Sequence, residues 1–171
     1  MKEYYNFRRE EYLAGIIPRM LIFSFLGIGW DVLVTLVQQL LSGKVMINAL
    51  CPASAWMYPI YATIPLLFYP VAAVLKRNRL GYFVRVLCFL AIFYIVEYGY
   101  ATFLSRFGII AWSYDWYLPH RYNGTNGYVS FHPVIMAMWT VFVVFAEGID
   151  FVLRSSFKTL ANTVKIFVDG K

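Results

Sequence analysis

Four long apolar segments dominate this chain, and each is long enough to cross a lipid bilayer as a helix. They cover residues 17–41, 55–75, 82–105 and 131–153. The hydrocarbon core of a bilayer is about 30 Å thick, and about 20 helical residues are needed to span it. Because 61% of the 171 residues are apolar and only 14% are charged, a soluble domain of this size could not bury its apolar surface. The pattern predicts an all-α polytopic membrane protein, in which a four-helix transmembrane bundle forms a single membrane domain over residues 1–171.

The second predicted span is unusual because it contains Pro59, Pro65 and Pro70. Each proline removes a backbone hydrogen bond and tends to kink a helix. Lipid cannot bond to the carbonyls that lose their partners, so neighbouring helices must do so. We therefore expect this helix to be bent and partly buried in the bundle.

Positive charge is divided unevenly between the two sides of the predicted bundle. Twelve of the 15 Lys and Arg residues lie on the side that holds both termini and the 76–81 turn, and three lie on the other side. The twelve are Lys2, Arg8, Arg9, Arg19, Lys76, Arg77, Arg79, Arg85, Arg154, Lys158, Lys165 and Lys171, and the three are Lys44, Arg106 and Arg121. The positive-inside rule then places both termini in the cytoplasm, in a plasma or inner membrane. These residues cluster between apolar segments rather than along one polar face, which favours membrane lipids and not nucleic acid as partners.

The residues after the fourth span have a helical pattern of their own. Apolar side chains recur at helical spacing at Phe157, Leu160, Ala161, Val164, Phe167 and Val168. Polar residues occupy the rest of the helical wheel, as in helices that lie in the plane of the headgroups. Residues 155–169 are therefore predicted to form an interfacial amphipathic helix.

The connection 106–130 is the longest and is rich in aromatic residues. They are Trp112, Tyr114, Trp116, Tyr117, Tyr122 and Tyr128. One interpretation is a belt of aromatic side chains at the level of the headgroups. The other is a folded cap over a cavity, with Gly108 and Pro119 in tight turns. Asn123-Gly124-Thr125 also has the pattern of a glycosylation acceptor.

Three acids, Asp31, Glu97 and Glu147, lie inside the apolar spans. A charged acid at the middle of a bilayer costs roughly 2.5–3.5 kcal/mol, so these side chains should face the bundle, carry a proton or find partners. Asp31 belongs to a stripe of small and polar residues at helical spacing: Ser24, Gly27, Asp31, Thr35, Gln38 and Ser42. Such a stripe is typical of a helix face that packs against other helices.

The depths of these acids can be compared by counting residues. Asp31 lies 12 residues after Arg19, and Glu97 lies 12 residues after Arg85. At a rise of about 1.5 Å per residue, each acid is roughly 18 Å from its basic landmark. Asp31 and Glu97 should therefore face one another or share a polar cavity. Glu147 should lie closer to the cytoplasm, within reach of Arg85.

The acids admit a structural interpretation and several functional ones. They could form a polar network that only fixes helix packing. They could also serve proton relay, cation coordination, or general acid chemistry on a lipid. The candidate catalytic residues are Asp31, Glu97 and Glu147, and the candidate substrate-binding residues are Tyr94, Tyr98, Trp112 and Tyr114. His120, His132 and Asp115 lack a recognised ligand spacing, so neither a metal site nor a cofactor is predicted.

The chain resembles the ABC-transporter type IV family of bacterial proteins, which are in turn similar to a group of vertebrate four-span membrane proteins of unknown function. The resemblance runs from about Gly29 to Phe151 and is carried by Trp30-Asp31, Ser54-Ala55-Trp56, Ile60-Tyr61, Ile95-Val96-Glu97-Tyr98, Trp112-Ser113-Tyr114-Asp115 and Glu147. It implies a transport-related membrane protein.

Two classes of function remain open at this point. The first is a non-enzymatic membrane component, either transport-related or an accessory subunit that binds other membrane subunits. The second is a small membrane enzyme that acts on a lipid or isoprenoid, with carboxylates as acid and base. A continuous cavity that reaches the acids and holds an acyl or isoprenoid chain would favour the enzyme.

Overall fold

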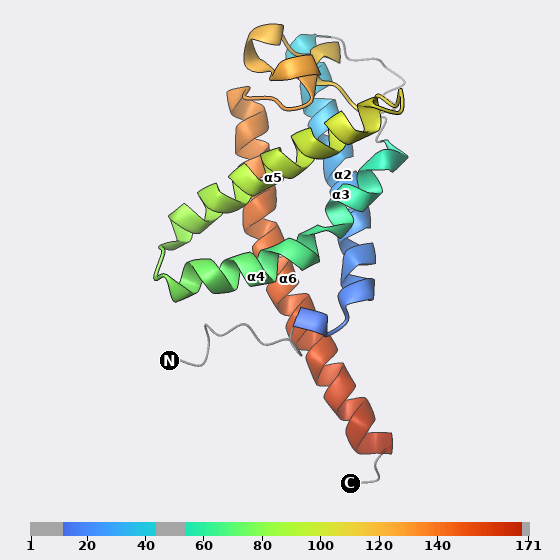
Figure 1. Cartoon of the computed structure of the whole chain (residues 1–171), viewed down its shortest axis with the longest axis vertical. Coiled ribbons are helices and arrows are strands. Elements are labelled where there is room, and N and C mark those ends of the chain that lie inside the picture. The colour runs from blue at the N-terminus through green and yellow to red at the C-terminus, as the bar shows by residue number, and fades with distance from the viewer. Residues whose placement is uncertain (1–11, 44–53, 169–171) are drawn as a thin grey trace.

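The computed structural model describes residues 12–43 and 54–168, and within these ranges the fold is all-helical with no β-strand (Figure 1). The α-helices are α2 (Ile16–Ser42), α3 (Tyr58–Ala62), α4 (Ile64–Arg77), α5 (Tyr82–Ser105) and α6 (Pro133–Val168). Short 3₁₀ turns are η2 (Ala55–Met57), η3 (Tyr114–Trp116), η4 (His120–Tyr122) and η5 (Thr125–Gly127). Four helical stretches in the described part are long and apolar enough to cross a membrane, which confirms the predicted class of multi-pass membrane protein.

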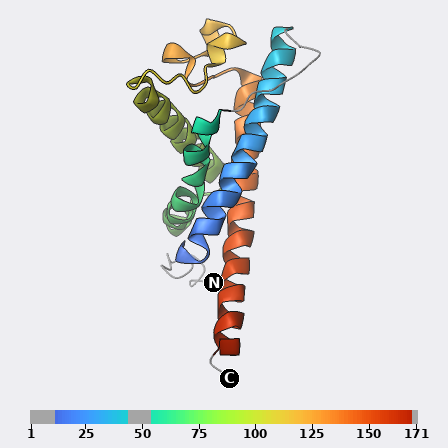
Figure 2. The same cartoon turned by 90° about the vertical axis from the view of Figure 1, so that its right-hand side faces the viewer.

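The helices are arranged around the antiparallel pair of α2 and α6, which lie side by side (Figure 2). The hairpin of α4 and α5 crosses α6 obliquely (Figure 1). The loop between α5 and α6 lies near the end of α2, and this end of the molecule is called the loop end below. The start of α2 and the end of α6 lie at the opposite end, as an even number of crossings requires. Which end faces the cytoplasm remains a prediction.

The second span is divided into two helices rather than kinked within one. Pro59 and Pro65 each occupy one of the first two positions of a helix, α3 and α4 respectively, where a missing N–H costs least. The break falls at Thr63, whose hydroxyl donates to the carbonyl of Ile60 (2.6 Å). Helix α2 supplies one bond on each side of the break, since Ser24 donates to the Tyr58 carbonyl (3.1 Å) and Arg19 donates to the Pro65 carbonyl (3.4 Å). With 44% of its apolar window buried, against 22–33% for the others, this is the most buried span, as expected.

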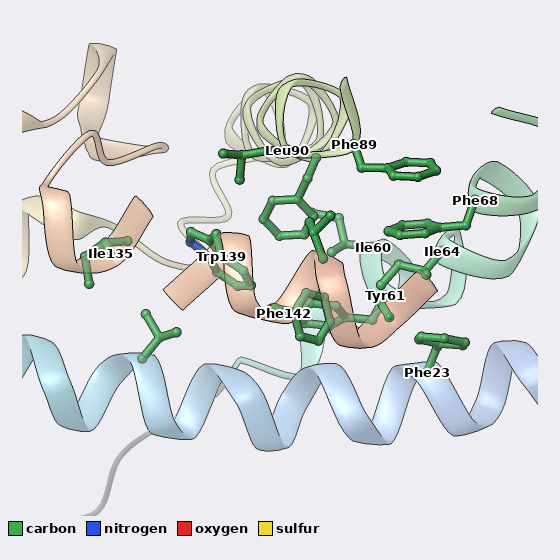
Figure 3. Packing of buried hydrophobic residues seen from close by; sticks show 14 of the residues in the cluster. Phe23, Ile60, Tyr61, Ile64, Phe68, Phe89, Leu90, Ile135, Trp139 and Phe142 are labelled. Carbon is green, nitrogen blue, oxygen red and sulfur yellow. The ribbon is translucent and has the colours of Figure 1, made fainter. Parts of the chain in front are cut away.

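Aromatic side chains fill the core where α3, α5 and α6 meet (Figure 3). The ring of Trp139 lies 4.4 Å from that of Phe93 and 5.7 Å from that of Phe142, measured between ring centres. Phe142 in turn contacts the ring of Tyr61 edge-on at 5.8 Å. These rings are buried, so their packing fixes the distances between α3, α5 and α6.

Helix α6 differs from prediction at its second half. The helical state of residues 155–168 is confirmed, but they continue the fourth span without a break. The segment Arg154-Ser155-Ser156 contains no Gly or Pro to end a helix, and Arg154 donates to Asp150 one turn earlier (3.0 Å). At 36 residues α6 is about 54 Å long, well beyond the thickness of a hydrocarbon core. It extends past the other helices (Figures 1 and 2), whereas the predicted helix lay in the interface plane.

Candidate functional site

A polar cavity lies at the loop end between α2, η2, α5 and the loop that follows α5. Its lining includes Asp31, Gln38, Glu97, Trp112 and Tyr114. Water centres have about 60 Å³ of room in it. Because one water needs roughly 10–15 Å³ on this measure, the cavity holds about four to six water-sized groups.

The first cavity acid, Asp31, is held by a tyrosine from the broken second span. The hydroxyl of Tyr61 donates to Oδ1 of Asp31 at 2.5 Å. Tyr61 can lie this close because Gly27, one turn before Asp31, has no side chain: an added Cβ would come within 1.9 Å of the Tyr61 ring. The small-residue stripe on α2 thus positions the acid's donor.

The second cavity acid, Glu97, ends a chain of hydrogen bonds that begins in the core. Nε1 of Trp139 donates to the Tyr114 hydroxyl (3.0 Å), which donates to Oε1 of Glu97 (3.0 Å). Burial raises the pKa of Tyr114 well above its usual 10.0, and the neighbouring Glu97 carboxylate raises it further, so this phenol remains a donor at neutral pH. Glu97 is only 1% exposed, and its Oε2 has no hydrogen-bond partner in the described structure.

Two further acids lie toward the opposite end of α6, and each has two basic partners. Asp150 pairs with Arg19 (2.5 Å) and with Arg154 (3.0 Å). Glu147 pairs with Arg85 (3.4 Å) and with Lys76 (3.6 Å). Glu147 and Asp150 are called the paired acids below.

The cavity acids have no such partners. Within residues 12–43 and 54–164, no Lys, Arg or His forms an ion pair with Asp31 or Glu97. Their bonded donors are the neutral hydroxyls of Tyr61 and Tyr114. Among the described residues, basic side chains therefore neutralise the paired acids, while the cavity acids are bonded to neutral donors.

The structure brings some of the predicted site residues together and separates others. Asp31 and Glu97 share the cavity, as their matched depths predicted. Glu147 lies apart from them and reaches Arg85, also as predicted. Among the predicted substrate-binding residues, Trp112 and Tyr114 line the cavity.

Tyr94 and Tyr98 do not line it. Tyr94 donates its hydroxyl to the Ser130 carbonyl (2.9 Å), and Tyr98 is 40% exposed with its ring near that of Tyr128. Tyr98 directly follows Glu97 on α5, and successive helical residues are rotated by about 100°, so the Tyr98 side chain faces away from the cavity.

The loop that follows α5 is a folded cap, as the second interpretation of its sequence predicted. Gly108 adopts a left-handed turn (φ 73°), and Pro119 precedes η4. Nε1 of Trp112 donates to the Tyr128 carbonyl (3.1 Å), and Asn123 forms an isolated bridge with Ser130. These bonds join the two halves of the loop over the cavity.

Polar residues of the cap serve its own structure. Asn123, in the glycosylation pattern, donates its side-chain amide to Oδ1 of Asp115 (2.8 Å). His120 also contacts Asp115 (2.9 Å), while the ring of His132 lies against Tyr122 instead. In the described part of the chain, no three His, Cys, Asp or Glu residues converge as metal ligands.

Sequence reasoning missed two buried groups. Arg19 was predicted only as a cytoplasmic charge, but it is fully buried against Asp150 and also donates to the Pro65 carbonyl (3.4 Å). Trp139, the start of the hydrogen-bond chain to Glu97, carried no signal beyond hydrophobicity. The indole N–H of a buried tryptophan normally has a hydrogen-bond partner, and that rule could have drawn attention to Trp139.

The fold and the cavity together define a multi-pass helical membrane protein with a capped polar cavity that holds two carboxyl groups. Comparison of the chain with protein-family models, curated proteins and solved structures finds no match. Its function must therefore be argued from its own residues.

Proposed function

We propose that this protein is a transport-related membrane component whose cavity takes up a small cation, a proton included, at Asp31 and Glu97. The observation that carries the proposal is the contrast between the two sets of acids. Each paired acid contacts two basic side chains, while the donors to the cavity acids in the described part of the chain are neutral hydroxyls.

An unneutralised pair of carboxylates is costly in this position. Each charged acid costs roughly 2.5–3.5 kcal/mol at mid-membrane, and two nearby negative charges also repel each other. A bound proton or cation removes both costs. Since cap residues line the cavity, uptake from the side opposite the predicted cytoplasm is the shortest route.

The size of the cavity supports this class over the lipid enzyme. Room for about four to six water-sized groups admits a small ion but not an acyl or isoprenoid chain. An apolar hollow between α4 and α5, beside Phe68 and Phe89, has only about 20 Å³ of room and includes neither acid. The resemblance to the ABC-transporter type IV family, still a prediction, agrees with a transport-related role.

Titration of the purified full-length protein tests the proposal. Intrinsic tryptophan fluorescence is a suitable signal, because Trp112 and Trp116 line the cavity and Trp139 is linked to Glu97 through Tyr114. Acid, sodium, potassium and ammonium salts would be titrated into wild type, Asp31→Asn, Glu97→Gln and the double variant. At least one titrant should give a saturable response that each single variant weakens and the double variant abolishes.

Glu147→Gln is the matched control, since it removes a membrane acid that lies outside the cavity. This variant should keep the response even if its stability falls. A wild-type response that persists unchanged in the double variant would refute the proposal.

A further inference from the structure

The cavity combines carboxyl groups with aromatic side chains at the cap, and this combination narrows the class of ligand. Trp112, Trp116 and Tyr117 line it from the cap, and Asp31 and Glu97 line it from α2 and α5. Faces of tryptophan and tyrosine attract cations, most strongly where water is partly excluded. Resting on the function proposed above, we infer that the cavity binds a small primary ammonium ion.

The hydrogen-bonding capacity of the acids agrees with an ammonium group. Tyr61 occupies Oδ1 of Asp31, and Tyr114 occupies Oε1 of Glu97. Oε2 of Glu97 is buried and lacks a donor among the described residues, and Glu97 is one of the residues that line the cavity. A primary ammonium has N–H groups from which this oxygen can accept a hydrogen bond, whereas a quaternary ammonium has none.

A hard metal ion fits this site less well. Calcium takes six to eight oxygen ligands, and magnesium requires a near-octahedral set. The hydroxyls of Tyr61 and Tyr114 each donate to one oxygen of an acid, so a metal ion would find few free carboxylate oxygens at this site. No cluster of three metal-ligating side chains occurs within the described ranges.

The volume of the cavity limits the length of the ligand beyond its ammonium group. With about 60 Å³ for water centres, a chain of a few heavy atoms fits beside the carboxyl groups. The half-exposed ring of Trp116, which is 52% exposed, is then available to the rest of the ligand at the mouth. Methylammonium and ethylammonium are the simplest probes of this class.

Isothermal titration calorimetry on the full-length protein in detergent tests the inference. Methylammonium chloride should bind, tetramethylammonium should bind at least several-fold more weakly, and sodium and calcium chloride should give no saturable heat. Glu97→Gln should abolish methylammonium binding. Trp116→Leu should weaken it about two- to fivefold, as expected for an exposed cation–π contact, and Trp116→Tyr should restore most of it.

Trp56→Leu is the matched control, because Trp56 is 49% exposed but does not line the cavity. Its affinity for methylammonium should equal that of wild type. Two results would overturn the ammonium assignment and leave the proposed function standing. One is binding of sodium or calcium that depends on Glu97 but not on Trp116, and the other is a response to protons alone. Absence of any proton or cation response that depends on Asp31 and Glu97 would overturn both.

Discussion

Replacing Gly27 with alanine should destabilise the protein through Tyr61. An added Cβ would lie 1.9–2.3 Å from three atoms of the Tyr61 ring, far inside van der Waals contact. Tyr61 is fully buried and packs edge-on against Phe142, so its ring cannot swing aside without disturbing the core. The substitution must therefore push apart α2 and α3 or displace the tyrosine.

The expected cost has two parts. Overpacking a buried contact costs about 1–3 kcal/mol. Displacing the ring also breaks the hydrogen bond from Tyr61 to Asp31, worth about 1 kcal/mol. The sum of about 2–4 kcal/mol corresponds to a fall in Tm of roughly 5–15 °C for a chain of this length.

Gly29→Ala supplies the matched control in the same helix, since a Cβ there would meet no atom within 4 Å. That variant should keep or slightly raise the Tm, because alanine favours helix over glycine by up to about 1 kcal/mol. Thermal unfolding of both variants in the same detergent provides the comparison. Combining Gly27→Ala with Tyr61→Ala should cost less than the two single changes together, since the clash is gone. Equal Tm values for the two glycine variants, or strict additivity of the double variant, would refute the reasoning.

Two further predictions concern Tyr114. Tyr114→Phe should lower the free energy of unfolding by about 1–3 kcal/mol in thermal or denaturant unfolding, because it leaves the Trp139 N–H and a Glu97 oxygen buried without a partner. Because the pKa of Tyr114 is raised in the folded chain, the unfolded chain releases the Tyr114 phenol proton at lower pH than the folded chain does. The contribution of the neutral phenol to the free energy of unfolding should therefore be complete below pH 10 and be lost as the pH rises beyond it. Phenolate absorbance should show fewer tyrosines titrating near pH 10 in the folded wild type than after unfolding, and Tyr114→Phe should reduce this difference by one.

The sequence predicted those features that depend on local pattern. Apolar runs of this length favour helices that can span a membrane, and the predicted 82–105 coincides with α5 while 17–41 lies within one residue of α2 at each end. Residue counting placed Asp31 and Glu97 at one depth because helices rise uniformly. The three prolines indicated a bend but not its position, since Pro59 and Pro65 begin helices and Pro70 lies inside one.

Features that depend on distant partners could not be predicted in this way. Arg19 and Asp150 are 131 residues apart, and no periodicity relates them. The cap is closed by bonds such as that from Trp112 to Tyr128, which composition alone does not reveal, so both a belt and a cap stayed open. Amphipathicity predicted a separate helix for the tail, whereas α6 continues through it, because nothing in Arg154-Ser155-Ser156 interrupts a helix.

The contrast between the two sets of acids leads to a final prediction that separates their roles. Asp150→Asn leaves two buried or nearly buried guanidinium groups, Arg19 and Arg154, without a countercharge, which costs about 3–5 kcal/mol when a buried pair is broken. Asp31→Asn and Glu97→Gln leave no cation behind among the described residues, because the donors to these acids are neutral hydroxyls, from which an amide oxygen can also accept. The amides in the cavity should therefore change the free energy of unfolding by less than about 1 kcal/mol, while Asp150→Asn lowers the Tm by roughly 6–20 °C. If the cavity amides proved as destabilising as Asp150→Asn, Asp31 and Glu97 would be structural groups whose charge the fold itself requires, and the reason for assigning them a ligand would be lost.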